Sequence, residues 1–119
     1  MMVKRSLTFA IMAFWPLASH AALSKDTAIS VGSFFAAAAQ CEDRKLIAAG
    51  QTKSITRALN HLVSAADKKL IEVGYRRGAR ESSVYVVQQK QWVTFIPDEA
   101  GCHRVQGVLD DYKAQLLPG

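Results

Sequence analysis

Apolar residues recur at helical spacing in three segments of the chain. The clearest pattern begins at Thr52, where apolar residues follow steps of three and four while charged residues mostly take the opposite side. These apolar positions are Ile55, Leu59, Leu62, Val63, Ala66, Leu70 and Val73. The spacing predicts an amphipathic helix that starts at Thr52 and either breaks near Asp67 or runs on to Gly74.

A second helix is predicted from Ser24 to Ala49. Ser24 suits an N-cap, and Gly50 is a natural C-terminal stop. The apolar stripe of this segment contains Val31, Phe34, Ala38 and Cys41. Cys41 is therefore expected to face the core.

The last helix is predicted to begin at Pro97 and Asp98 and to end before Pro118. Its apolar residues, again spaced by three and four, are Cys102, Val105, Leu109, Tyr112 and Leu116. Both cysteines of the chain thus lie on apolar helical stripes. A disulfide between Cys41 and Cys102 is predicted, because no Cys-x-x-Cys or metal-type spacing is present.

The segment between Gly74 and Pro97 carries conflicting signals. The residues around Tyr85 and around Val93 favour strands, but the "QQKQ" between them has none of the Gly, Asn or Asp of tight hairpins. Helix propensity favours a further helix from about Arg80 to Phe95, which would be the third in chain order. The expected fold is thus an all-α bundle of about four helices stapled by one disulfide; helices plus a short β-hairpin around residues 84–96 are the alternative.

The first 21 residues have the three regions of a secretory signal peptide. Lys4 and Arg5 precede an apolar run of eleven residues, and Ser19 and Ala21 suit a cleavage site. The run is shorter than the roughly twenty residues of a membrane-spanning helix, so no permanent anchor is expected. We predict residues 1–21 as the signal peptide, residues 22–119 as a single domain, and a periplasmic or secreted location.

The charge of the chain disfavours nucleic acid as a partner. The formal net charge is +5, and the predicted signal peptide carries two of these charges. The remaining excess is small, and no basic stripe is interleaved with stacking aromatic residues. The predicted partner is another envelope or secreted protein.

Three arginines within five residues form the best candidate for a binding surface. Arg76, Arg77 and Arg80 follow Tyr75, and Arg and Tyr are enriched at interface hot spots. The alternative is a solvated face, because Glu72 and Glu81 are close enough in sequence to neutralise part of the cluster.

The nearby Gly74 and Gly78 are expected at a helix end and turn, with a groove for a second backbone as the alternative. Trp92, Phe95 and Ile96 are expected in the core.

No catalytic or cofactor-binding arrangement is predicted. After residue 21 the chain has only two histidines, His61 and His103, and both cysteines are assigned to the disulfide. The acidic residues that occur in pairs are adjacent in sequence. On a helix, such neighbours point about 100 degrees apart and do not converge as a catalytic acid and base must. No metal site, cofactor or enzymatic activity is therefore expected.

In general plan, the chain resembles several groups of bacterial periplasmic interaction proteins, including immunity proteins that block cell-wall-degrading effectors. The resemblance covers only the architecture and identifies no residue. The sequence therefore predicts an exported protein-binding module, such as an inhibitor, immunity protein or secretion accessory acting by steric occlusion. A carrier of a small apolar ligand and a cationic protein that binds the envelope surface are the alternatives.

Overall fold

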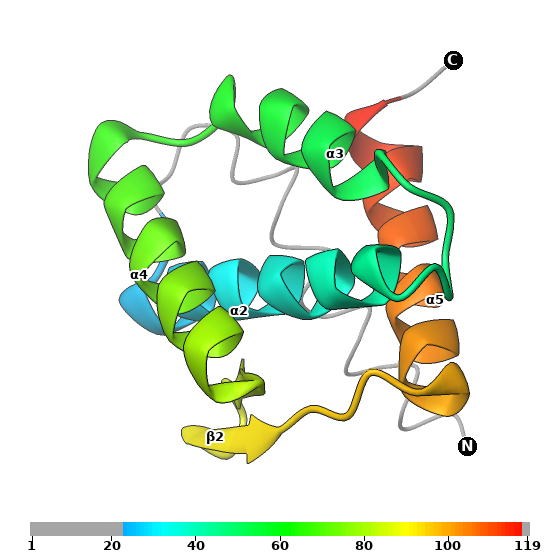
Figure 1. Ribbon diagram of the computed structural model, residues 1–119. Coiled ribbons are helices and arrows are strands. Elements are labelled where there is room, and N and C mark those ends of the chain that lie inside the picture. Colours follow the sequence, from blue (N-terminus) through cyan, green and yellow to red (C-terminus); the bar gives the residue numbers. More distant parts are fainter. Residues whose placement is uncertain (1–22, 118–119) are drawn as a thin grey trace.

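The computed structural model describes residues 23–117, which form four helices and one β-hairpin. The elements are α2 (Lys25–Asp43), α3 (Gln51–Asn60), α4 (Ala65–Glu81), β1 (Ser83–Val86), β2 (Gln91–Thr94) and α5 (Glu99–Leu116). Helix α2 crosses the middle, with α4 and α5 at its two ends, α3 above it and the hairpin below (Figure 1). The predicted signal peptide, residues 1–21, lies outside the described residues.

The predicted helical stripes of α2, α3 and α5 meet in one core, whereas Leu62, Ala66 and Val73 of the stripe predicted from Thr52 are exposed. The buried residues of the core come from α2, α3 and α5 and include Val31, Phe35, Cys41, Ile55, Leu59, Cys102, Val105, Leu109 and Tyr112. The rings of Phe34, Phe35 and Tyr112 lie 5.6–5.7 Å apart, at tilted angles typical of packed aromatic residues. The largely helical fold with one disulfide is thus confirmed.

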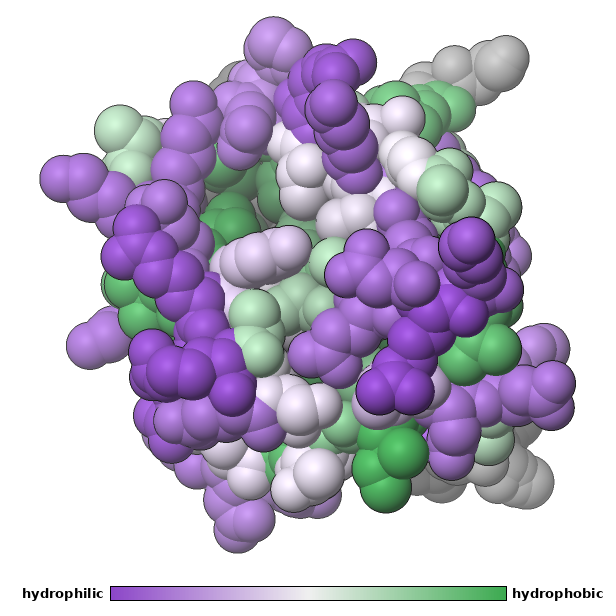
Figure 2. Space-filling model, viewed as in Figure 1, coloured by the Kyte–Doolittle hydropathy of each residue, from purple (hydrophilic) through white to green (hydrophobic). Residues whose placement is uncertain are grey.

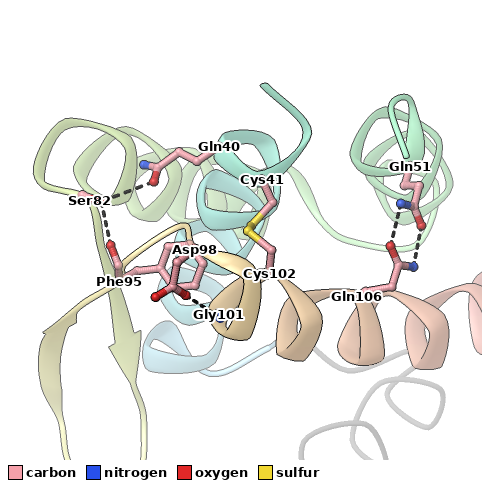
Figure 3. Close-up of a disulfide and its surroundings, with 9 residues drawn as sticks. All are labelled: Gln40, Cys41, Gln51, Ser82, Phe95, Asp98, Gly101, Cys102 and Gln106. Carbon is pink, nitrogen blue, oxygen red and sulfur yellow. Dashed lines mark hydrogen bonds between the residues drawn. A yellow bond between two sulfur atoms is a disulfide. The ribbon is translucent and has the colours of Figure 1, made fainter. Parts of the chain in front are cut away.

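The disulfide joins Cys41 near the end of α2 to Cys102 near the start of α5, with the two Cα atoms 5.6 Å apart. Figure 3 shows this bond and, beside it, a second link that ties α3 to α5. There the side-chain amides of Gln51 and Gln106 exchange two hydrogen bonds of 2.8 Å. The predicted pairing of the two cysteines is confirmed.

Helix α2 ends six residues earlier than predicted. Lys45 adopts a left-handed conformation with φ of 61°, its N–H donates to the Glu42 carbonyl, and the N–H of Leu46 donates to the Cys41 carbonyl. This is a Schellman ending with lysine in the place that glycine usually takes. Gly50, predicted as the stop of this helix, instead precedes α3 with φ of 90°.

The pattern predicted as one helix from Thr52 is divided between α3 and α4. The break falls at residues 61–64, slightly before Asp67, because Ser64 caps α4 by accepting a hydrogen bond from the Asp67 N–H. Helix α4 then continues through Gly74 and Gly78 to Glu81. The predicted helix end and turn at these glycines are therefore wrong.

The glycines instead let α2 and α4 approach each other closely. A Cβ at Gly74 would overlap the carbonyl oxygen of Ile29, and one at Gly32 would overlap that of Ile71. A Cβ at Gly78 would lie 3.1 Å from the Cα of Ser33. These contacts correspond to the alternative prediction, in which the glycines form a groove that another backbone enters.

The favoured third helix from Arg80 to Phe95 is wrong, and the alternative hairpin is present. Strands β1 and β2 pair antiparallel, with Tyr85 opposite Trp92. A four-residue loop joins them, and Lys90 within it has φ of 52°. Loops of this length do not require the Asn-Gly sequence of two-residue turns, so its absence was not evidence against a hairpin.

Candidate functional site

The hairpin is held on α2 by two serine hydroxyls. The N–H of Tyr85 donates to Ser33 Oγ at 2.9 Å, and Ser30 Oγ donates to the Tyr85 carbonyl at 2.8 Å. Ser33 is fully buried and also donates to the Ser30 carbonyl. Because these bonds satisfy both outward-facing backbone groups of Tyr85, β1 is fixed against the helix without a third strand.

One face of the hairpin carries an aromatic pair that Arg77 covers. The rings of Tyr85 and Trp92 lie 5.4 Å apart across the strands, and the Arg77 guanidinium lies 4.4 Å from the centre of the Trp92 ring. Arg77 also donates to Glu81 at 3.0 Å. The hydrogen bonds and charges of Arg77 and Arg80 lower the pKa of Glu81. Arg77 thus connects α4 to the hairpin and has a structural role.

The other residues of the predicted arginine cluster lie on the exposed side of α4. Arg76 pairs with Glu72 at 3.1 Å, and Arg80 lies 3.6 Å from Glu81. Figure 2 shows the hydrophilic side chains along α4, at the left of the view. Exposed pairs of this kind contribute little to stability, so the guanidinium groups are accessible but partly neutralised. The binding role of Tyr75, Arg76, Arg77 and Arg80 stays a prediction.

The opposite side of the hairpin forms an apolar groove with α2 and α5. The groove has a volume of about 390 Å³ and opens to the surface. Phe34 and Ala37 of α2 form one part of its lining, and Val108 of α5 forms another. The hairpin region contributes apolar residues that include Val84, Val86, Val93 and Phe95.

Arg104 provides a positive charge in this groove. It lies on α5 among the lining residues, and its side chain is exposed. Within residues 23–117 it forms no ion pair. The groove thus combines an apolar surface with one available guanidinium group, which is the chemistry that recognises an apolar group next to a carboxylate.

The free edge of β2 provides further polar groups. The Phe95 N–H donates to the Ser82 carbonyl at 2.8 Å, so bonded pairs alternate from this point along the hairpin. The backbone N–H and C=O groups of Trp92 and Thr94 consequently point away from β1. No residue of the described chain bonds to them. A segment in extended conformation would find donors and acceptors there.

Two predicted core residues are more exposed than expected. Ile96 is 64% exposed, so its predicted place in the core is wrong. Trp92 is half-buried beneath Arg77, whereas Phe95 packs against the core. Neither the groove nor the role of Arg104 was predicted from the sequence. The β-branched residues Val84 and Val93 were the available signal, but their importance depends on forming opposite strands rather than one helix.

The remaining candidate chemistry is dispersed. Residues 23–117 contain no group of three His, Cys, Asp or Glu side chains arranged to hold a metal ion. His103 borders a second, more polar hollow near Lys45 and Glu99. None of the described helices is long and apolar enough to cross a membrane.

Comparisons of the chain with protein-family models, with characterised proteins and with solved structures gave no match.

Proposed function

We propose that the protein is exported by a cleaved signal peptide, residues 1–21, and acts in the envelope as a protein-binding module. In this proposal the groove between the hairpin and α5 binds an extended apolar segment of another envelope or secreted protein. The partner segment carries a carboxylate that pairs with Arg104. The protein acts by covering this segment, as an inhibitor, immunity protein or secretion accessory does.

The open apolar groove is the observation that carries this proposal. Its valines supply contacts for apolar side chains, while the free edge of β2 supplies backbone donors and acceptors. Strand addition draws affinity from such an edge and specificity from neighbouring side-chain pockets. The charge of Arg104 favours an acidic group in the partner.

The disulfide supports both the location and the mechanism. Disulfides persist in oxidising compartments, which agrees with an exported protein. The bond joins α2 to α5, two of the three sides of the groove. A groove with fixed sides loses little conformational entropy when it binds, which favours affinity.

The test is selection of peptides from a random phage-displayed library on the oxidised domain. We expect selected peptides to share spaced apolar residues and an acidic residue. Their binding should fall at least tenfold with Val93→Asp or Arg104→Glu. Val73→Asp and Arg57→Glu are matched controls, because Val73 and Arg57 are also exposed but lie away from the groove.

Selection of no peptide, or equal binding by the groove variants and the controls, would contradict the proposal. Native mass spectrometry of the purified protein tests the carrier alternative, which the size of the groove also favours. A co-purifying lipid that Val93→Asp removes would support a carrier of apolar ligands. Binding to anionic vesicles that weakens strongly with salt would instead support a protein of the envelope surface.

A further inference from the structure

Asp67 is a buried carboxylate without a cationic partner in the described part of the chain. It lies in the first turn of α4 and is 4% exposed. The N–H of Leu23 donates to its Oδ2 at 3.0 Å, and the ion pairs within residues 23–117 all involve other carboxylates. The start of α4 stabilises part of this charge. Buried carboxylates nevertheless usually have a cation as partner, because burial removes the water that stabilises the charge.

The predicted cleavage places such a cation next to Leu23. Hydrolysis of the peptide bond between Ala21 and Ala22 adds one water: Ala21 gains a terminal carboxylate, and the Ala22 nitrogen changes from a neutral amide to a protonated amine. Three covalent bonds separate this nitrogen from that of Leu23. Covalent geometry alone therefore keeps the Ala22 nitrogen within about 4 Å of the Leu23 nitrogen, which donates to Asp67.

We propose that Asp67 is the binding site for the α-ammonium group of the mature N-terminus. This inference rests on the export and cleavage that the proposed function includes. The charge pair forms only after cleavage, because the precursor has an uncharged amide at this position. Removal of the signal peptide therefore stabilises the attachment of the N-terminus of α2 to α4.

Other charged residues are close in sequence to Leu23 and Asp67. They are Lys25 and Asp26 at the start of α2, His61 in the turn before α4, and Lys68 and Lys69 on α4. No described ion pair joins any of them to Asp67. All of these side chains, and Asp67 itself, are present in both the free and the N-acetylated chain, so the difference between these two chains reports on the α-amino group.

The experiment uses a chain that begins at Ala22, released from a fusion protein so that signal-peptide cleavage is not needed. The pKa of its α-amino group is measured by NMR after ¹³C-dimethylation. We expect a value about one unit above the ordinary 7.7–8.0, and an ordinary value in Asp67→Asn. Asp43→Asn, which changes an exposed aspartate, is the matched control and should retain the raised pKa.

Urea unfolding between pH 6 and pH 9.5 provides the second readout. Since the ammonium gains a partner on folding, its pKa is raised in the folded state. Its stabilisation is thus complete below the unfolded value and is lost as the pH rises through the folded value. N-acetylation should remove this loss without changing any side chain, so the test does not depend on the folding of Asp67→Asn.

An ordinary α-amino pKa in the Ala22 chain, or the same pH dependence in the acetylated chain, would refute the pairing. The N-terminal mass of the exported protein tests the premise separately. A mature chain that begins at Ala22 supports the inference. A different first residue would overturn it and would correct the cleavage site of the proposed function, while leaving the groove proposal intact.

Discussion

At the scale of single residues, Glu42 caps a helix to which it does not belong. Gly50 precedes α3 and has no side chain, but the Glu42 carboxylate accepts hydrogen bonds from the Gly50 N–H, the Thr52 N–H and the Thr52 hydroxyl at 2.6–3.0 Å. Burial acts to raise the pKa of Glu42, but these hydrogen bonds outweigh it and lower the pKa below the usual value. The loop between α2 and α3 therefore closes on one carboxylate.

We predict that Glu42→Gln destabilises the fold by about 1 kcal/mol at neutral pH, as loss of a helix cap does. The folded pKa of Glu42 is lowered, so its contribution is present above the unfolded pKa and is lost as the pH falls through the folded value. Urea unfolding at pH 7 and pH 3 should show a smaller acid loss for Glu42→Gln than for the wild type. Asp43→Asn is the exposed neighbouring control, and equal acid losses in wild type and Glu42→Gln would refute the role.

The glycines of α4 support a second prediction at this scale. Gly74→Ala should destabilise the protein by roughly 2 kcal/mol or more, because the added methyl group overlaps the backbone of α2 and the helices must separate. Gly107→Ala on α5 is the control, since nothing lies within 4 Å of its added Cβ. That change should stabilise the protein by up to about 1 kcal/mol. Thermal unfolding that ranked the two variants in the opposite order would contradict the close packing of α2 on α4.

At the scale of elements, the hairpin depends on the buried hydroxyl of Ser33. Ser33→Ala leaves the Tyr85 N–H without its acceptor, which we expect to destabilise the protein by about 1–3 kcal/mol. Ser83 is the contrast, because its buried Oγ has no hydrogen-bond partner among the described residues. Ser83→Ala should change stability little. Hydrogen exchange should show faster exchange of the hairpin amides in Ser33→Ala alone, and equal exchange in both variants would argue against this attachment.

The elements also show which features could be predicted from sequence. The core-facing stripes of α2 and α5 and the position of the disulfide followed from periodicity, because buried helical residues recur at three and four. The stripe predicted from Thr52 was correct at Ile55 and Leu59 but not at Leu62 and Val73, which are exposed. The end of α2 did not follow from periodicity, because it depends on a left-handed conformation at Lys45 that composition does not indicate. The hairpin was an open alternative because its strands depend on Ser30 and Ser33, more than fifty residues away in sequence. The groove was missed for the same reason.

At the scale of the whole molecule, the disulfide joins the first described helix to the last. The bond closes a separation of 61 residues and lies within the core between α2 and α5. Beyond it, the side of the molecule that contains α3 is tied to α5 by the amide pair of Gln51 and Gln106 and by Lys113, whose Nζ donates to Gln51 at 2.7 Å. The attachment of α5 to the rest of the fold thus has one covalent and several polar components.

We therefore predict that replacing Cys41 and Cys102 together by Ala lowers the free energy of unfolding by roughly 2–4 kcal/mol, partly because a long loop is no longer closed in the unfolded state. The double variant should unfold at a lower urea concentration, and reductant should destabilise the wild type but not the variant. Since α5 forms one side of the groove, peptide binding should weaken in this variant even under conditions in which the variant is fully folded. If binding at a urea-free, fully folded condition were unchanged, the disulfide would stabilise the fold without fixing the groove.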